Sequence, residues 1–392
     1  MKKHYLMNKR FIAMTIACLA WIGLRAETWS LYFWSDVAYE ADKTYSGTNY
    51  GPFVETSETG VFTLNNVIVP TTNLKYCIHN ANWSINYGWS ELHDGIIVGI
   101  GETIKMGSTT QASGWCPLPP FTYNVVFNAN DTTIRFDLVK QEGKKKISIL
   151  GDSYSTMYGS LTPYTNEAFF PRYDVQIAEQ TWWYKVIKSG DYQLEVNNSY
   201  SGSTMTYNTL PDWHDTSKKM DISTSFIARA SNLGNPDIIL LCGGTNDEWN
   251  NDNSMGEYKY SDWTDDDLYL FRPGTAYLLN LVKTTYPEAQ VIFILNDILP
   301  RVSESILTIC EHYNIVVAQP KDIDKDESSH PSPDGMTTIA NSVIDILGGE
   351  KIPTSTERVC NSQVRYNKII KNGQILIDKD GISYTLLGTS IR

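Results

Sequence analysis

The chain has 392 residues, of which 42% are apolar, and a formal net charge of −12. This length and composition are typical of a globular protein with a sizeable core, and they exclude a disordered chain. The acidic balance argues against nucleic acid and anionic membrane surfaces as partners, because both attract basic patches.

Residues 1–26 have the pattern of a secretory signal peptide. A basic start precedes the apolar stretch Phe11–Leu24, and Leu24-Arg25-Ala26 approximates a cleavage site. The apolar stretch is short for a membrane span, so we expect no span in the mature chain. Because the segment carries five basic residues and no acidic ones, its removal takes the charge from −12 to about −17. We expect a secreted or extracytoplasmic protein, with lipid attachment at Cys18 as an alternative.

The cysteines that follow this segment stand at positions 77, 116, 242, 310 and 360, with no C-x-x-C spacing. We therefore expect no structural zinc site. An oxidising compartment permits a Cys77–Cys116 or a Cys310–Cys360 bridge, and the sequence proves neither. Cys242 lies in an apolar run and is expected to be a buried small hydrophobe.

Residues 27–141 show short strand-like runs separated by Gly, Pro, Asn and Asp. The runs are 29–34, 60–64, 74–78, 95–100 and 133–138. Many short strands with turn residues between them predict an all-β, sandwich-like domain.

This region is rich in aromatic residues, which allow two interpretations. Most of them are expected to fill the core or cover the edges of the sandwich. Alternatively, an exposed subset, Trp83, Tyr87 and Trp89, forms a stacking surface for sugar rings. The domain is thus expected to be either carbohydrate-binding or accessory.

From the charged run 140–146 onward, strand-like and helix-like segments alternate up to about residue 348. Expected strands are 147–150, 192–196, 236–242, 290–295 and 315–318, and expected helices are 180–188, 221–231, 273–285, 303–312 and 336–347. Such alternation with apolar strands predicts a doubly wound parallel sheet over residues 144–348. No strand precedes a G-x-G-x-x-G or a P-loop, so nothing favours nucleotide binding.

Residues 354–392 carry two hairpin signals, Asn372-Gly373 and Asp380-Gly381, between strand-like runs. A small C-terminal β-hairpin module is expected. The sequence is compatible with two roles for this module: sorting of the protein, or simple packing on the preceding domain.

Gly151-Asp152-Ser153 ends the first strand of the α/β region. Taken alone, this tripeptide is ordinary turn chemistry, and Asp152 is expected to support the turn. Gly202 follows the second strand, Asn246 follows the third, and His330 precedes the last helix. Each has a simple explanation as a turn, cap or loop residue. Together they fall on one edge of the sheet, where open α/β sheets bind ligands.

In this order, Gly151-Asp152-Ser153, the Gly202 loop, Gly244-Thr245-Asn246-Asp247 and His330-Pro331 resemble the four blocks of the SGNH, or GDSL-type, hydrolases. The resemblance covers residues 144–348. It implies a flavodoxin-like α/β domain and a serine esterase without a cofactor or metal. It also implies Ser153 as the nucleophile, His330 as the base, and Ser153, Gly202 and Asn246 as the oxyanion hole.

The third member of the triad departs from the family pattern. The usual Asp, three residues before the histidine, is replaced by Glu327. Glu327 is the expected partner of His330. Asp326 or a backbone carbonyl are the alternatives.

The expected activity is removal of O-acetyl groups from polysaccharide, as the family's range and the export signal imply. Trp213 and Trp249 are expected to line the substrate cleft, and His214 could do so as well. The alternatives are a lipase or thioesterase of the same superfamily, and a catalytically inert surface protein that binds glycans.

Overall fold

The computed structural model describes residues 27–35, 47–72, 74–88, 99–107, 114–161, 167–212, 214–250, 254–297 and 299–354, together with the backbone of 367–371, 374–379, 382–385 and 390–391. These residues divide into two compact units, one ending at Gly349 and the other beginning at Glu350. The expected signal segment, with Cys18, lies outside the described residues. No helix in the described part of the chain combines the length and apolar character that crossing a membrane requires.

A five-stranded parallel sheet, ordered β12-β11-β13-β14-β15, forms the centre of the α/β region. Its strands are β11 (Lys145–Gly151), β12 (Tyr192–Ser199), β13 (Ile238–Gly243), β14 (Gln290–Leu295) and β15 (Val316–Ala318). Every residue of β13 is buried, which is why its sequence is a continuous apolar run rather than an alternating one. The strand order is that of the flavodoxin-like fold, so the expected fold class is confirmed.

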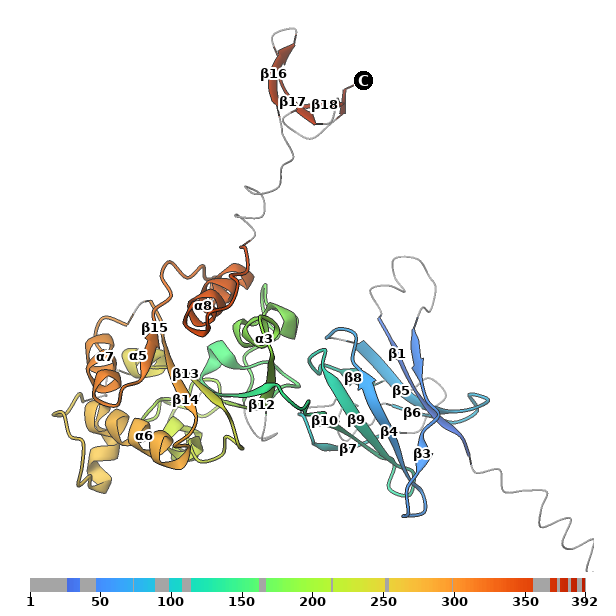
Figure 1. Cartoon of the computed structure of the whole chain (residues 1–392), viewed down its shortest axis with the longest axis horizontal. Helices are drawn as coiled ribbons and strands as arrows, with labels where there is room; N and C mark the ends of the chain where they lie inside the picture. The colour runs from blue at the N-terminus through green and yellow to red at the C-terminus, as the bar shows by residue number, and fades with distance from the viewer. Residues whose placement is uncertain are drawn as a thin grey trace, which may run out of the picture. The chain divides into compact units, whose positions relative to one another are not determined.

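Helices cover both faces of this sheet (Figure 1). The helices are α3 (Trp182–Lys188), α4 (Phe226–Arg229), α5 (Thr245–Trp249), α6 (Phe271–Thr285), α7 (Ser303–His312) and α8 (Pro333–Leu347). Side chains of α4, α6 and α7 share one core cluster with Leu150, Leu241 and Phe293 of the sheet. α3 and α8 pack against each other, and α8 also contacts β14 and β15.

One predicted helix is broken in the structure, and one helix of the structure has no predicted counterpart. The segment predicted as one helix over 221–231 is a 3-10 turn, Ile222–Thr224, followed by the short α4. The break occurs because the Ser225 side chain accepts the Ala228 N–H and starts a new helix. α5 was not predicted as an element. It begins after Gly244, whose φ of 100° allows the sharp turn out of β13.

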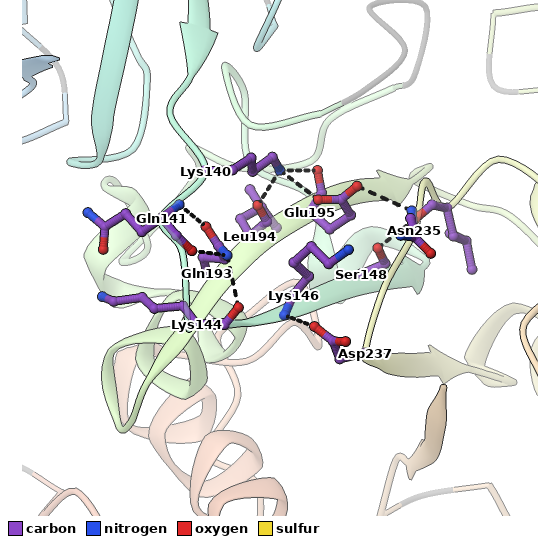
Figure 2. A network of polar contacts seen from close by, with 11 residues as sticks. Lys140, Gln141, Lys144, Lys146, Ser148, Gln193, Leu194, Glu195, Asn235 and Asp237 are labelled. Carbon is purple, nitrogen blue, oxygen red and sulfur yellow. Dashed lines mark hydrogen bonds and ion pairs between the residues drawn. The ribbon is translucent and has the colours of Figure 1, made fainter. Parts of the chain in front are cut away.

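The charged run before β11 is fixed to β12 by a polar network (Figure 2). The Gln193 side-chain amide donates to the carbonyls of Gln141 and Lys144, at 2.9 Å each. Lys140 pairs with Glu195 at 3.0 Å. The run thus anchors the start of β11, at the end of that strand opposite Ser153.

Before this region lie two antiparallel five-stranded sheets, as expected for an all-β domain. One contains β1 (Trp29–Trp34), β2 (Thr48–Tyr50), β5 (Leu74–Asn80), β6 (Asn86–Tyr87) and β8 (Gly114–Cys116). The other contains β3 (Val54–Glu55), β4 (Val61–Ile68), β7 (Thr103–Lys105), β9 (Thr122–Asn128) and β10 (Thr133–Leu138). Buried side chains of both sheets form one core cluster. The predicted run 95–100 lies largely outside the described residues.

The aromatic residues singled out in this domain have different environments. Trp83 is 47% exposed. Tyr87 packs on the core, with its ring 5.5 Å from Trp29 and 5.6 Å from Phe127, so its expected place on an exposed stacking surface is wrong. Trp89 lies outside the described residues.

The bridge that the sequence permits between Cys77 and Cys116 does not form, and both are buried free thiols. Cys116 is paired with Leu74 across the sheet, so their side chains share a face. Cys77 is three residues beyond Leu74 and therefore points to the other face. Cys242 and Cys310 are also buried and free, and Cys360 lies outside the described residues.

The unit that begins at Glu350 contains a four-stranded antiparallel sheet. Its strands are β16 (Asn367–Lys371), β17 (Gln374–Lys379), β18 (Ile382–Thr385) and β19 (Ser390–Ile391). The strands follow the predicted hairpin runs, with β19 in addition. The domain limits drawn from the sequence, 27–141, 144–348 and 354–392, stay predictions.

Candidate active site

Ser153 is separated by one residue from the end of β11, which lies between β12 and β13 in the sheet. Oδ1 of Asp152 accepts the backbone N–H of Tyr154 at 3.1 Å and thereby caps the 3-10 turn Ser153–Ser155. Ser153 itself is only 8% exposed. The capped turn thus holds the serine at the carboxyl edge of the sheet, where ligands bind in this fold.

His330 lies in a tight loop before α8, within hydrogen-bonding reach of the serine. Its Nε2 is 2.9 Å from Oγ of Ser153. The backbone N–H of Asp326 donates to the His330 carbonyl at 2.8 Å, and Ser329 takes a φ of 64° to close the loop. The Tyr154 hydroxyl donates to the Ser329 carbonyl at 2.7 Å, so the serine turn and the histidine loop are tied directly together.

The other ring nitrogen of His330 faces Ser328. Nδ1 is 3.1 Å from the Ser328 carbonyl oxygen and 3.1 Å from its hydroxyl oxygen. Because a carbonyl only accepts, Nδ1 carries the proton, and Nε2 is left free to accept one from Ser153. The Ser328 hydroxyl in turn donates to Oδ1 of Asp326 at 2.5 Å. The carboxylate therefore acts on the imidazole through Ser328 rather than by direct contact.

Glu327, which the sequence favours as the partner of His330, is exposed. In the part of the chain that the structure describes, no hydrogen bond joins it to His330. The loop turns so that residue 328, not 327, faces the imidazole. The geometry therefore corresponds to the backbone-carbonyl alternative, with Asp326 behind it.

Two further predicted residues lie beside Ser153. Gly202, at a φ of 78°, and Asn246, the second residue of α5, line the same cavity as the serine. One N–H of the Asn246 amide donates to the Ser203 carbonyl at 2.9 Å, which fixes the amide and leaves its second N–H for a ligand. Among the described contacts, the backbone N–H groups of Ser153 and Gly202 have no acceptor. The arrangement suits an anionic oxygen.

A buried arginine that the sequence did not single out holds these loops together. Arg229 is 5% exposed, and its guanidinium donates to the carbonyls of Gly151 (3.1 Å), Thr224 (2.9 Å) and Asn198 and to the Ser203 hydroxyl (2.9 Å). Burial lowers its pKa to about 9, so it is still a cation at neutral pH. The single residue thus connects the Ser153 turn to the Gly202 loop. Its only sequence signal, a basic residue within an apolar helix, is too common to identify it.

Phe169 covers the imidazole of His330. The two rings are stacked with centroids 3.5 Å apart and an interplanar angle of 7°. The Phe169 backbone N–H donates to Oγ1 of Thr156 at 2.9 Å, and that hydroxyl donates to the Ser153 carbonyl at 2.9 Å. The stack limits the histidine to one orientation and shields one of its faces from water.

The serine opens into a cavity of about 490 Å³. It is lined by Ser153, Glu167, Ala168, Phe169, Arg172, Ser201, Gly202, Leu210, His214, Asn246, Trp249 and His330. Trp249, predicted to line the cleft, is 47% exposed there, and His214 is also at the cavity. Trp213 lies outside the described residues.

Burial lowers the pKa of His330, an effect that the Ser328 carbonyl and the Asp326 charge partly oppose. The imidazole is therefore neutral at neutral pH, the form that accepts a proton. Burial raises the pKa of Asp152 to about 7 and that of Asp247 to about 7. Oδ2 of Asp247 accepts the Met205 N–H at 2.9 Å. Asp152 and Asp247 thus support backbone turns next to the serine.

Among the described residues, no group of three or more His, Cys, Asp or Glu side chains could hold a metal ion.

A flavodoxin-like sheet with a serine and a histidine in contact at its carboxyl edge is an arrangement found in hydrolases. A family model described as GDSL-like lipase/acylhydrolase matches residues 145–347, just over half of the chain. The chain belongs to this family, as the four sequence blocks predicted.

Two solved structures of proteins described as GDSL-like lipases are similar to the chain. The one from Bacteroides uniformis is 44% identical, with a TM-score of 0.49, and the match covers 53% of this chain and 97% of that one. The one from Bacteroides ovatus is 43% identical, with a TM-score of 0.49, and covers 53% and 99%. An acetyl xylan esterase from Butyrivibrio proteoclasticus is 15% identical, with a TM-score of 0.35, over 73% and 88%. No curated protein matches the chain.

The loop before His330 yields a first prediction. Asp326→Asn should lower kcat about 5- to 10-fold, because it weakens the hydrogen bond that holds Ser328, worth about 1 kcal/mol. His330 can accept a proton only when it is neutral, so kcat/KM should fall as the pH drops through its pKa. Since the Asp326 charge raises that pKa, its removal should move the acid limb of the profile to lower pH.

Glu327→Gln is the matched control and should leave both kcat and the acid limb unchanged. The opposite result, a shift with Glu327→Gln and none with Asp326→Asn, would assign the acid to Glu327. The measurement is the pH profile of p-nitrophenyl acetate hydrolysis for the three proteins.

Proposed function

We propose that the chain is a serine carboxylesterase in which Ser153 is the nucleophile and His330 the general base. The observation that carries this proposal is the 2.9 Å distance between Oγ of Ser153 and Nε2 of His330, at the edge of an open cavity. A serine hydroxyl is a weak nucleophile unless a base takes its proton, and this distance is right for that transfer.

In the first step, Ser153 Oγ attacks the ester carbonyl carbon while its proton passes to Nε2 of His330. The oxyanion is stabilised by the N–H groups of Ser153 and Gly202 and by the free N–H of the Asn246 amide. The imidazolium then gives its proton to the departing alcohol oxygen, and an acyl-serine is left. Water, activated by His330, attacks this ester and releases the acid and the free serine.

The imidazolium of these steps is held by the contacts at Nδ1. Its N–H donates to the Ser328 carbonyl, and the Asp326 charge acts on it from behind the Ser328 hydroxyl. Phe169 keeps the ring in plane. These contacts orient the imidazole in place of a carboxylate bonded directly to Nδ1.

The substrate that the cavity supports best is an O-acetyl group on a polysaccharide. Trp249 presents an exposed indole at the cavity, a surface on which a flat sugar face can stack. Glu167, Arg172 and His214 line the same cavity. A long acyl chain would desolvate these polar side chains, whereas sugar hydroxyls can hydrogen-bond to them.

Trp249→Ala tests this substrate class. We expect kcat/KM for acetylated xylan to fall roughly 3- to 10-fold. This factor corresponds to the loss of about 0.5–1.5 kcal/mol that an aromatic contact contributes. The loss on p-nitrophenyl acetate should be smaller, since its leaving group is a single small ring. Acetate release is the measurement, and Tyr269→Ala, which removes an exposed ring that does not line the cavity, is the control.

Hydrolysis of a series of p-nitrophenyl esters, together with a glycan-binding measurement, separates the rival functions. Rates that rise from acetate to octanoate esters would indicate a lipase or thioesterase instead. Glycan binding by the wild-type protein with no turnover of any ester would indicate an inert binding protein.

Export from the cytoplasm is part of the proposal. It is supported by the basic and apolar pattern of residues 1–26. The mass of the protein recovered outside the cells would show whether this segment is removed.

A further inference from the structure

The β-rich domain presents one large aromatic side chain to solvent in a way that the proposed esterase site does not explain. Trp83 lies in the turn between β5 and β6 and is 47% exposed. It is far along the chain from the Ser153 cavity and is not among the residues that line it. A single exposed apolar residue is ordinary, so its surroundings decide whether it has a role.

The indole of Trp83 lies flat on a fixed ring. Its centroid is 3.6 Å from that of His79, with an interplanar angle of 11°. His79 is 3% exposed and is held at both nitrogens, with Nδ1 2.9 Å from the Asn80 carbonyl and Nε2 3.0 Å from Oδ1 of Asn49. His79 thus supports one face of the indole, while Trp83 as a whole stays 47% exposed.

The backbone holds this side chain outward in an unfavourable conformation. Trp83 has a φ of 59°, a region that side-chain-bearing residues rarely adopt. The turn is kept by the Trp83 N–H donating to the Asn80 carbonyl at 3.0 Å and by Asn82 Oδ1 accepting from the Ser84 N–H at 3.2 Å and hydroxyl at 2.7 Å. Strained conformations that persist because their surroundings hold them occur often at binding sites.

Two more aromatic rings lie on the same side of the sheet. Tyr32 is 5.4 Å from Trp83 and roughly perpendicular to it, and Trp34 is 5.5 Å from Tyr32 and nearly parallel. Tyr32 and Trp34 alternate along β1 with Leu31 and Phe33, which belong to the core. They are half-buried and point away from that core.

We propose that Trp83, backed by His79 and flanked by Tyr32, binds a neutral pyranose ring of a polysaccharide. An exposed indole that is held in place by a stacked ring matches the flat C–H face of a sugar, whose hydroxyls stay in water around the ring. Membrane binding is disfavoured by the net charge of −12, and a stable protein partner needs a far larger patch than one indole face. The site does not rest on the proposed esterase function, since it lies in other residues.

The test measures binding without turnover. Full-length Ser153→Ala protein is run on native gels that contain wheat arabinoxylan, hydroxyethyl cellulose or galactomannan, and its retardation gives an affinity for each. At least one polysaccharide should retard the protein, and adding Trp83→Asn should weaken that binding about tenfold or more. Asparagine is chosen because it tolerates a positive φ, so the turn is kept while the ring is lost.

The control is Tyr269→Asn, which removes an exposed ring whose neighbour Tyr207 is T-shaped rather than stacked against it, and which should bind like the parent. Equal melting temperatures of the variants show that the fold is intact. Trp83→Phe, with a smaller flat face, should retain intermediate binding. Retardation of Trp83→Asn equal to that of the parent, or no retardation of the parent by any of the three polysaccharides, would overturn the proposal.

Discussion

Ser153→Ala should lower kcat for p-nitrophenyl acetate about 10⁴-fold or more, the scale of loss when a serine hydrolase loses its nucleophile. Without Oγ there is no acyl-serine, and His330 has no proton to accept at 2.9 Å. The N–H donors are left in place, so a small residual rate over water is expected.

A covalent probe gives a second measurement of the same prediction. A fluorophosphonate should add its mass to the wild-type chain at Ser153 and leave the alanine variant unlabelled. Ser155→Ala is the matched control, because Ser155 lies in the same 3-10 turn and lines no part of the cavity. Turnover by Ser153→Ala at the wild-type rate would exclude Ser153 as the nucleophile.

Asn246→Ala is expected to have the second largest effect, a loss of about 10²–10³ in kcat with little change in KM. The amide is expected to bind the oxygen more strongly when it becomes an oxyanion, so its loss falls on the transition state rather than on the bound substrate. The variant also leaves the Ser203 carbonyl without its donor, which should cost about 1 kcal/mol of stability.

Two variants separate these effects. Asn246→Asp keeps the size of the side chain but places a carboxylate beside the oxyanion, so its kcat should be at least as low as that of the alanine variant. Asn250→Ala removes an amide one turn further along, which bonds to the Asn208 carbonyl at 2.8 Å and lines no part of the cavity. We expect this variant to have a lower melting temperature and an unchanged kcat. A wild-type kcat in Asn246→Ala would remove Asn246 from the oxyanion hole.

Both predictions depend on loops that are held more firmly than their sequences suggest. Arg229 ties the carbonyl of Gly151 to the hydroxyl of Ser203, and Tyr154 ties the serine turn to the loop of His330. The hydrogen bonds of Arg229 within the described residues go to neutral oxygens, which is costly for a buried cation and fits a position where several backbone carbonyls must be kept in place.

Much of this protein could be derived from the sequence alone, because the signals involved are local. Continuous apolar strands such as β13 indicate that the sheet is buried on both faces. The alternation of strands with helices limits the possible strand orders of the sheet. Once the sheet is parallel, residues that follow its strands meet at one edge. Ser153, Gly202 and Asn246 could thus be placed together before any coordinates, and so could His330 before the last helix.

Only the tertiary structure determined the contacts of side chains whose partners are distant in sequence or are selected by the geometry of a loop. The left-handed conformation of Ser329 turns Ser328 rather than Glu327 toward the imidazole, and one residue of difference in a loop leaves no periodic signal. Phe169 and Arg229 reach the site from segments with no motif. The faces of β5 and β8 determine that Cys77 and Cys116 stay apart. The periodicity of strands and helices depends on residues that are close in sequence. The direction in which a loop side chain points depends on contacts with residues that are distant in sequence and form only in the complete fold.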